Sequence, residues 1–422
     1  MTGTVLVVGA GAAGLLASYR AAVCGARVLL IEKNEKPGKK IYITGKGRCN
    51  LTNDADQETF FASVISNPRF LYSAYAAFSN EDIKALLSEN GCPVKTERGK
   101  RVFPVSEHAS DVTKALVRAC EKAGVALYLN TEVESLLSEE DHVCGVKLRG
   151  GQELKADAVI LATGGLSYPT TGSTGDGYRF AESFGHEIVS CIPSLVSFRT
   201  EDRGYFACAG LTLKNVVLKV FQAGGKKPLY SEQGEVLFTH NGISGPLVLS
   251  ASAYLGRRLE KKETLEAVLD LKPTAEEADL DRRLVKALEE EKNRSMKNVM
   301  KEFLPSSMIL PFLEGLGIEP GLSANSLKKE TRKSIAAGMK ALRLPILSTG
   351  GFEEAVITKG GVRVSEIDPG SMQSKRVRGL FFAGEVIDVD ALTGGFNLQI
   401  AWSTGFLAGE KAAAYTEEFY GI

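Results

Sequence analysis

The amino-terminal segment has the pattern of a strand, a glycine-rich turn, a helix and a second strand. Residues 4–8 are continuously apolar, as expected for a strand that is buried on both faces. Three glycines follow at the spacing G-x-G-x-x-G, namely Gly9, Gly11 and Gly14. A small-residue helix then runs to about Cys24, and a second apolar strand at 27–31 ends at Glu32. Such glycines let the backbone approach a pyrophosphate and the acid can bond ribose hydroxyls, so the segment predicts a dinucleotide-binding domain, with NAD and FAD both open.

The composition is that of a soluble globular protein with two or three domains. The chain has 422 residues, of which 44% are apolar and 24% are charged. Its 51 Lys and Arg balance 51 Asp and Glu, and this lack of net charge argues against nucleic acid or a membrane surface as a partner. A small-molecule substrate is therefore expected, and the oligomeric state stays open.

The cysteines, histidines and apolar runs bear on the compartment and on metal content. The seven cysteines include no C-x-x-C pair, which favours a reducing compartment over a disulfide framework. The four histidines are scattered and show no metal-ligand spacing. The amino terminus lacks a basic segment and a cleavage site, and no stretch reaches about 20 clean apolar residues. We expect a cytoplasmic protein with no membrane span and no metal.

Two further segments repeat the order of an apolar strand followed by a glycine turn. One is 159–165, which ends in Ala-Thr-Gly-Gly, and the other is 379–385, which ends in Ala-Gly-Glu. A domain that binds only a nicotinamide cofactor does not need backbone segments this far apart in the sequence to complete its binding site. An extended FAD does need them. Glu385 is placed to bond ribityl hydroxyls. A third turn at 393–398 precedes a helix through Ala413, whose N-terminus can stabilise the negative charge of a reduced flavin.

The middle of the chain differs from both ends. Residues 194–272 show β-type alternation and turn signals, and helical spacing follows, with a capping box predicted at Thr274. The simplest interpretation is a single nucleotide-binding domain, formed by 1–193 and 346–422, which is interrupted by an insert of strands and helices.

Two amphipathic helices are expected in the first part of the chain. They cover 80–90 and 110–123, with Asn80 and Ser110 as their N-caps.

Six segments carry a family resemblance: Gly9–Gly14, Gly38–Asn53 with its Gly-Arg-Cys-Asn core, Arg101–Pro104, Ala162–Gly177, Thr239–Pro246 and Phe382–Gly405. On these motifs the chain resembles the aminoacetone oxidase family of FAD-binding proteins, also called YhiN-like or BaiN-like. The resemblance spans nearly the whole chain and is weakest at 255–345. It implies an α/β fold in which a glutathione-reductase-like FAD-binding Rossmann domain, 1–193 and 346–422, is interrupted by a β-barrel at 194–273 and a small helical insert at 274–345.

The resemblance also implies a set of FAD-binding residues. They are Gly9, Gly11, Ala13, Gly14, Glu32, Lys33, Lys40, Gly47, Arg48, Cys49, Asn50, Val133, Ala162, Thr163, Gly164, Gly384, Glu385, Gly395, Phe396, Asn397 and Leu398. Val133 would contact adenine through its backbone. Arg48 is chemically suited to the pyrophosphate, with help from Lys40. Cys49 has no partner cysteine nearby in the sequence, so packing is favoured over a redox role.

The reaction stays open once the cofactor is assigned. The sequence holds no second G-x-G-x-x-G unit, so electrons would arrive from a transiently bound NADH or NADPH, or leave to oxygen. The family implies FAD-dependent hydride transfer with a small or medium organic substrate. That is either NAD(P)H-driven reduction of an enone, bile-acid or steroid-like, or oxygen-dependent oxidation of an amine such as aminoacetone. The alternatives are an RNA-modifying flavoprotein and a non-catalytic flavin-bound sensor.

Two residues are candidates for moving the proton. His240 lies inside the family motif Thr239–Pro246, and the ordinary pKa of histidine suits proton transfer. Tyr168 lies beside the expected flavin edge and could donate a proton or stack on the substrate.

Overall fold

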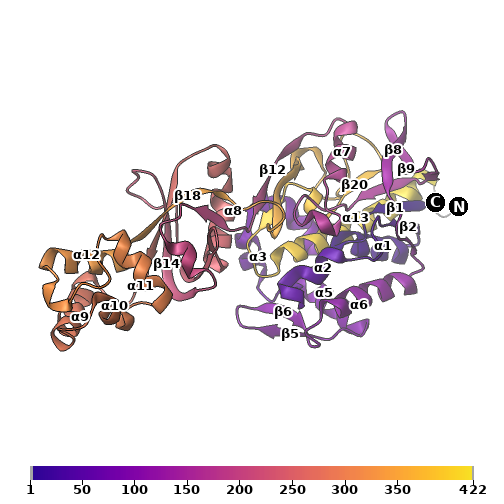
Figure 1. Cartoon of the computed structure of the whole chain (residues 1–422). Coiled ribbons are helices and arrows are strands. Elements are labelled where there is room, and N and C mark those ends of the chain that lie inside the picture. Colours follow the sequence, from indigo (N-terminus) through magenta and orange to yellow (C-terminus); the bar gives the residue numbers. More distant parts are fainter. Residues whose placement is uncertain (1–2, 421–422) are drawn as a thin grey trace. The chain divides into compact units, whose positions relative to one another are not determined.

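The computed structural model describes residues 3–420, and the contacts within the chain divide it into two units. Unit 1 consists of the residues up to Pro193 together with those from Phe352 onward, and unit 2 runs from Ser194 to Gly351. In Figure 1, unit 1 therefore combines indigo and purple segments with the yellow carboxyl-terminal ones. Each unit has its own hydrophobic core.

Unit 1 is built on a five-stranded parallel sheet in the order β20-β11-β1-β2-β7. The strands are β1 (Thr4–Val8), β2 (Arg27–Ile31), β7 (Ala126–Tyr128), β11 (Ala158–Leu161) and β20 (Leu380–Phe382). In β1, Val5 pairs with Val28 on one side and with Ala158 on the other. Because β1 is covered on both faces, Val5 is fully buried, as its continuously apolar sequence predicted.

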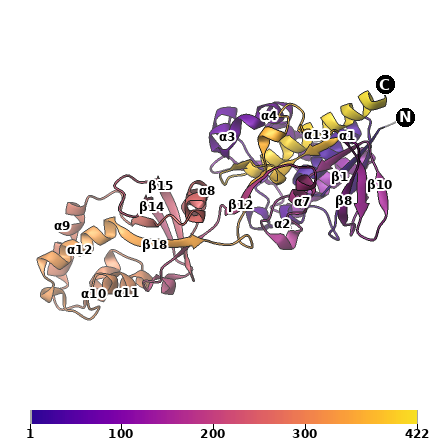
Figure 2. The same cartoon turned by 90° about the horizontal axis from the view of Figure 1, so that it is seen from above.

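The helices of unit 1 include α1 and α13, which contact this sheet directly. The helices are α1 (Ala12–Val23), α2 (Lys39–Ile43), α3 (Gln57–Ser63), α4 (Tyr72–Ala77), α5 (Asn80–Glu89), α6 (Ala109–Lys122), α7 (Asp176–Ser183) and α13 (Phe396–Tyr420). Both views show α13 running alongside α1 (Figures 1 and 2). The helices approach closely because α13 carries glycine at the contact: a Cβ on Gly405 would lie 2.3 Å from the carbonyl oxygen of Ala13. No helix within residues 3–420 is both long enough and apolar enough to cross a membrane.

Four smaller sheets complete unit 1. Two have three strands, in the orders β10-β9-β8 and β3-β6-β5, and two are the pairs β12-β19 and β21-β4. Their strands are β3 (Thr52–Asn53), β4 (Val64–Ser66), β5 (Val94–Glu97), β6 (Arg101–Pro104), β8 (Val133–Glu139), β9 (His142–Leu148), β10 (Glu153–Lys155), β12 (Ile188–Ser194), β19 (Ile357–Val362) and β21 (Asp390–Ala391).

Unit 2 contains a closed six-stranded barrel in the order β13-β16-β15-β14-β17-β18, which confirms the expected barrel. Its strands are β13 (Phe198–Thr200), β14 (Thr212–Gln222), β15 (Tyr230–Thr239), β16 (Gly242–Ser244), β17 (Leu265–Asp270) and β18 (Leu342–Thr349). Its helices are α8 (Pro246–Glu260), α9 (Glu277–Glu290), α10 (Met296–Val299), α11 (Ser306–Gly315) and α12 (Lys329–Lys340). Residues 346–349, which the sequence placed in the returning segment, instead belong to the last barrel strand. Leu344 and Ile346 on that strand are buried in the unit 2 core.

Three predicted N-terminal caps are wrong. Helix α5 is capped by Ser79, whose N–H donates to Asp82 Oδ2 at 2.7 Å, whereas Asn80 is buried and bonds elsewhere. His108, and not Ser110, precedes α6, and α9 begins after Glu276 without the box predicted at Thr274. In each case the helix begins within three residues of the predicted cap, because apolar periodicity locates a helix better than it locates its first residue.

Candidate flavin-binding site

Three glycine turns meet at one edge of the parallel sheet. Strands β1, β11 and β20 are neighbours, so the turns that follow them leave the sheet at their shared carboxyl-terminal edge. These turns are 9–14, 162–165 and 383–385. The N–H of Ala162 donates to the carbonyl oxygen of Val8 at 2.9 Å, which joins the first two. The structure thus brings together segments from opposite ends of the chain.

The first turn has the shape that a pyrophosphate site needs. Gly9 has a φ of 101°, and a Cβ there would lie 2.6 Å from the carbonyl oxygen of Ala162. A Cβ on Gly14 would lie 1.8 Å from the carbonyl oxygen of Gly9. Around Gly11, by contrast, no atom lies within 4 Å of the Cβ position. Gly11 is the N-cap of the 12-residue helix α1, and its open side leaves room for a phosphate at that helix terminus.

Glu32 directly follows strand β2 and is buried, and both of its carboxylate oxygens accept hydrogen bonds. Oε2 accepts a hydrogen bond from the N–H of Ala10 at 2.9 Å. Oε1 accepts from the backbone N–H and the side-chain amide of Asn34 at 2.9 and 2.6 Å. These bonds hold the carboxylate beside the first glycine turn, and Oε2 keeps acceptor capacity for a ribose hydroxyl.

Lys33, the next predicted cofactor residue, makes polar contacts with the first residue of α7 and with the loop before it. Its ammonium is 2.7 Å from Asp176 Oδ2 and 2.6 Å from Thr174 Oγ1. Burial opposes ionisation of Asp176, but the Lys33 ammonium outweighs it and the pKa of that carboxyl lies below its usual value. A cofactor contact of Lys33 stays a prediction.

A polar network joins Lys40 of α2 to the turn after β20. The Lys40 ammonium lies 2.6 Å from Glu385 Oε2 and 2.5 Å from Ser167 Oγ. Glu385 Oε1 accepts from Ser167 Oγ at 2.7 Å and from the N–H of Thr358 at 2.8 Å. Burial opposes ionisation of Glu385, but the Lys40 charge and these donors outweigh it, so the pKa of Glu385 is lowered. The carboxylate is therefore held ionised at the edge where the glycine turns meet.

Arg48 lies in a cluster of ion pairs. Its guanidinium pairs with Glu107 and, at 2.6 Å, with Glu97, and it stacks over the Phe103 ring 4.1 Å from the centroid. The hydrogen bonds from Arg48 and Lys95 hold the pKa of Glu107 at about 2. The predicted pyrophosphate contact of Arg48 stays a prediction, since the guanidinium already bonds two carboxylates within the protein.

Cys49 and Asn50 follow Arg48 and differ in character. Cys49 is fully buried, and burial raises its pKa to about 12, so the thiol stays protonated. Asn50 presents a buried side-chain oxygen, Oδ1, that has no hydrogen-bond partner within residues 3–420. Thr163 Oγ1, in the turn after β11, is likewise buried and unpartnered there.

These observations test whether FAD fits the site. A buried polar atom without a partner is costly, and a bound molecule is one way to satisfy it. The orphaned oxygens of Asn50 and Thr163, the open side of Gly11 and the ionised Glu385 come from four segments of unit 1. An extended polar cofactor across the glycine turns fits this set.

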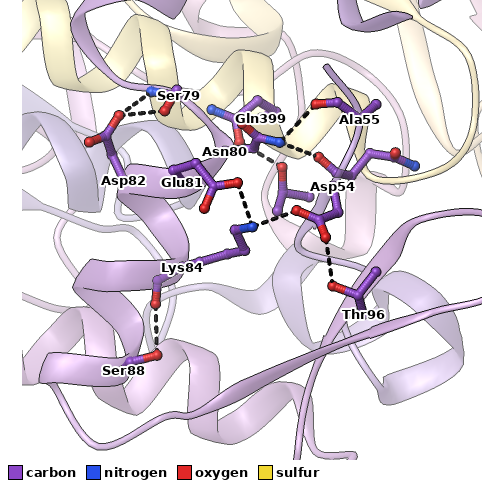
Figure 3. Close-up of polar contacts among 12 residues, drawn as sticks. Asp54, Ala55, Ser79, Asn80, Glu81, Asp82, Lys84, Ser88, Thr96 and Gln399 are labelled. Carbon is purple, nitrogen blue, oxygen red and sulfur yellow. Dashed lines mark hydrogen bonds and ion pairs between the residues drawn. The ribbon is translucent and has the colours of Figure 1, made fainter. Parts of the chain in front are cut away.

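The segment that follows Asn50 is anchored to α5 (Figure 3). The Asn80 side-chain amide donates to the carbonyl oxygens of Asn53 and Ala55 at 2.8 and 3.0 Å. Lys84 lies between Asp54 and Glu81, at 2.5 and 2.6 Å from their carboxylates. These contacts hold the segment in place and explain why Asn80 is buried.

The start of α13 is held by its own side chains. Asn397 Oδ1 accepts from the N–H of Ala391 at 2.9 Å, and its Nδ2 donates to the carbonyl oxygen of the same residue at 2.8 Å. Phe396 is buried, with its ring centroid 6.2 Å from that of Phe60, and Leu398 is half-buried. Asn397 thus shapes the turn at 391–397 that ends at the helix N-terminus.

The remaining predicted residues have simpler surroundings. Val133 is buried at the start of β8, and Ala13 is buried in α1. The glycines Gly47, Gly164, Gly384 and Gly395 all have positive φ angles. Their contacts with a cofactor stay predictions.

The two proposed proton-transfer residues belong to different units. Tyr168 in unit 1 is half-buried and has a φ of 52°, which is rare for an aromatic residue. His240 in unit 2 is exposed at the turn between β15 and β16.

Sequence reasoning missed three residues that organise the site, namely Asn34, Ser167 and Thr358. Thr358 lies on β19, and its Oγ1 accepts from the N–H groups of Leu166 and Ser167 at 2.8 and 3.1 Å. Thr358 lies in a segment whose alternating pattern is that of an ordinary strand, so the sequence does not single it out. Its role is seen only once the fold brings this strand beside Leu166 and Ser167. Ser167 does lie inside the family motif 162–177.

Comparison with known proteins identifies the family to which the chain belongs. Residues 3–411 match the family model described as HI0933-like protein Rossmann domain. The chain is 32% identical to the 3-dehydro-bile acid delta(4,6)-reductase of Clostridium scindens, over 96% of this chain and 98% of that protein. It is 33% identical to the ribosomal RNA dihydrouridine synthase of Escherichia coli, over 97% of this chain and 98% of that protein.

A solved structure shows the same fold. The 3-ketosteroid delta1-dehydrogenase of Sterolibacterium denitrificans superposes with a TM-score of 0.53 at 15% identity, covering 98% of this chain and 100% of that one. The match over residues 3–411 and the full-length relatives together lead to one assignment: the chain belongs to the HI0933-like family of FAD-binding Rossmann proteins, a family of FAD-dependent oxidoreductases.

Proposed function

We propose that this chain reduces a carbon–carbon double bond conjugated to a carbonyl group, with FAD as its hydride carrier. The main support is that the two relatives described above are both named for a reaction of this kind. A delta(4,6)-reductase acting on a 3-dehydro bile acid reduces double bonds conjugated to a ketone. Making dihydrouridine from uridine reduces a ring double bond conjugated to a carbonyl. Either reaction adds one hydride and one proton across the activated double bond.

The residues of unit 1 are proposed to bind and orient the cofactor. FAD at this site would supply two-electron hydride transfer. The first glycine turn and the N-terminus of α1 would hold the pyrophosphate, and Glu32 would hold a ribose. Asn50 Oδ1, Thr163 Oγ1 and Glu385 would accept further hydrogen bonds from it. The N-terminus of α13 would favour the negative charge of the reduced form.

NADH or NADPH is proposed as the transient electron donor. The chain has one G-x-G-x-x-G unit of the strand–turn–helix kind, which the FAD would occupy. Oxygen-dependent oxidation of an amine such as aminoacetone would use the same cofactor, but the two relatives described above are not named for that chemistry.

Tyr168 is the proposed proton donor. It follows Ser167, whose hydroxyl lies in the Lys40–Glu385 network, and its backbone has an uncommon left-handed conformation. Such strained residues cluster at functional sites. His240 is the second candidate, from its place in the family motif.

An RNA base is the second candidate substrate, and the distribution of charge favours it. Unit 2 has 24 Lys and Arg against 19 Asp and Glu, a formal net charge of +5, whereas unit 1 has 27 against 32, or −5. The neutral total therefore conceals a basic unit. A net positive charge attracts phosphate backbones.

One experiment distinguishes these reactions. The FAD-loaded protein is reduced anaerobically with NADH or NADPH, and a 3-oxo-Δ4 bile acid or unmodified ribosomal RNA is then supplied. In a separate anaerobic mixture, aminoacetone is added to the protein with its flavin still oxidised. Flavin reoxidation by one of the first two, with a product heavier by two hydrogens, supports the proposal and identifies the substrate class. Flavin that is bleached by aminoacetone and not by either nicotinamide would overturn it.

A further inference from the structure

Unit 2 contains a cavity of about 260 Å³ where the barrel meets the helical segment. Its walls come from the start of β14, the end of β17 and the chain that leads into α11. The apolar part includes Leu213, Leu271, Phe303 and Met308, all of which are buried. This cavity lies wholly within unit 2, and the proposed flavin site lies wholly within unit 1.

A β-bulge in β14 shapes one wall of the cavity. The register of β14 with β15 shifts between Leu213 and Val216, and Asn215 between them has a φ of 56°. A bulge inserts an extra residue and redirects the neighbouring side chains. As a result Leu213 and Val216 are both buried, while Lys214 is exposed at the cavity wall.

Three cations surround this cavity without an acidic partner among the described residues. Lys214 and Lys272 line it, and the guanidinium of Arg283 lies over Phe303, 5.6 Å from the ring centroid. The acid closest to Lys272 in the sequence, Asp270, is ion-paired with Lys340 at 2.7 Å. Burial of Lys272 and the positive charge of Arg283 both lower the Lys272 pKa.

We infer that this cavity binds a small organic anion: a carboxylate on an aromatic or short aliphatic body. The carboxylate would lie at Lys272 and Lys214, and the apolar body would pack against Phe303 and Met308. An apolar cavity of about 150 Å³ is enough to hold benzene, so this one admits an aromatic ring with a carboxylate. It is smaller than the ~300–1,000 Å³ pockets that hold drug-sized ligands, so the anion is a ligand separate from the enone or RNA substrate.

The test is a calorimetric titration of the full chain with benzoate, compared with the neutral benzyl alcohol. Benzoate is expected to bind saturably at one site, and benzyl alcohol about fivefold or more weaker, since it lacks the charge-assisted bonds. Lys272→Gln is expected to weaken benzoate by a similar factor. Lys219→Gln is the matched control, because Lys219 is exposed on the same strand β14 but does not line the cavity.

Two further measurements test the shape and the apolar wall of the cavity. Thr212→Trp places a bulky ring at an exposed position on the cavity wall and is expected to abolish benzoate binding while the circular dichroism spectrum is unchanged. Inorganic phosphate should bind more weakly than benzoate, because it leaves the apolar wall unfilled. The inference is overturned if benzoate does not saturate, if benzyl alcohol or phosphate binds equally well, or if Lys272→Gln and Lys219→Gln behave alike. None of these outcomes depends on FAD or turnover, so they are independent of the proposed reaction.

Discussion

The Lys40 ammonium lies 2.6 Å from Glu385 Oε2, which links the helix after the first βαβ unit to the turn after the last strand of the parallel sheet. These residues are 345 positions apart in the chain. About a fifth of each side chain is exposed, at 22% and 19%, so water screens the pair only partly. The pair therefore fixes a carboxylate in its ionised form at the sheet edge where the glycine turns meet.

Lys40→Met is expected to lower both stability and FAD affinity. It leaves Glu385 partly buried without its cation, and such a loss costs about 1–3 kcal/mol. Urea unfolding of the apoprotein and a fluorescence titration with FAD measure the two effects. Lys39→Met is the matched control, because Lys39 pairs with the exposed Glu35 on the adjacent loop. Equal losses in the two variants would contradict a role for the Lys40–Glu385 pair.

The same pair predicts a dependence of stability on pH. The folded-state pKa of Glu385 lies below its usual value of about 4.3, so its contribution is present above pH ~4.3 and is lost as the pH falls through the folded-state pKa. In Lys40→Met, the largest influence that lowers the pKa of Glu385 is removed, and only the hydrogen bonds from Ser167 and Thr358 still oppose the effect of burial. The difference in unfolding free energy between wild type and Lys40→Met should shrink below pH 4.3. A difference that is constant down to the acid transition would disprove this.

Gly11→Ala and Gly14→Ala should have different effects. A methyl group on Gly14 would collide with the carbonyl oxygen of Gly9, so Gly14→Ala should unfold the protein at a lower temperature. A methyl group on Gly11 meets no atom within 4 Å, so the apoprotein of Gly11→Ala should melt like wild type. If a phosphate occupies that space, Gly11→Ala should weaken the affinity for FAD about tenfold or more. A tenfold loss corresponds to ~1.4 kcal/mol of binding free energy. Wild-type FAD affinity in a stable Gly11→Ala protein would place the pyrophosphate elsewhere.

His186 predicts a second pH effect. Its side chain is fully buried, bonded to Ser374 at 2.8 Å and to Glu366 at 3.1 Å, and burial holds its pKa below the ordinary value of about 6.5. The unfolded chain binds this proton more readily, so unfolding free energy should fall as the pH drops below ~6.5. His186→Gln should flatten that slope in urea unfolding between pH ~5 and ~7.5. The control His108→Gln changes an exposed residue and should keep the wild-type slope.

Tyr168→Phe tests the proposed proton donor. Loss of the hydroxyl should slow substrate reduction about 100-fold, in the range of general acid catalysis, while NADH or NADPH still reduces the bound flavin at the wild-type rate. Stopped-flow absorbance separates the two half-reactions. His240→Gln is compared in parallel. A wild-type rate of flavin reoxidation in Tyr168→Phe would remove Tyr168 from the mechanism.

The local sequence pattern was sufficient to predict the first βαβ unit. The apolar run at 4–8 with Gly9, Gly11 and Gly14 predicted the first βαβ unit, because both strand burial and the tight turn depend on adjacent residues. The start of α5 at 80 was predicted from periodicity, but its cap, Ser79, was not. Asn80 was the predicted cap, but its side chain donates hydrogen bonds to backbone carbonyl groups far away in the sequence. Tertiary contacts alone decide which of these two roles the side chain takes.

The sequence by itself therefore determined the glycine turns, the buried parallel strands, the barrel-bearing insert implied by the family motifs, and FAD as the cofactor. Only the tertiary structure decided which charges meet: Arg48 pairs with Glu97 and Glu107, and Glu385 gathers Lys40, Ser167 and Thr358. It also assigned residues 346–349 to the barrel and divided a neutral chain into an acidic and a basic unit. The physical reason is the distance along the chain between the residues that interact. Backbone conformation and burial of a strand follow from neighbours along the chain, whereas an ion pair or a sixth barrel strand depends on which distant segments the packed cores bring within a few ångströms.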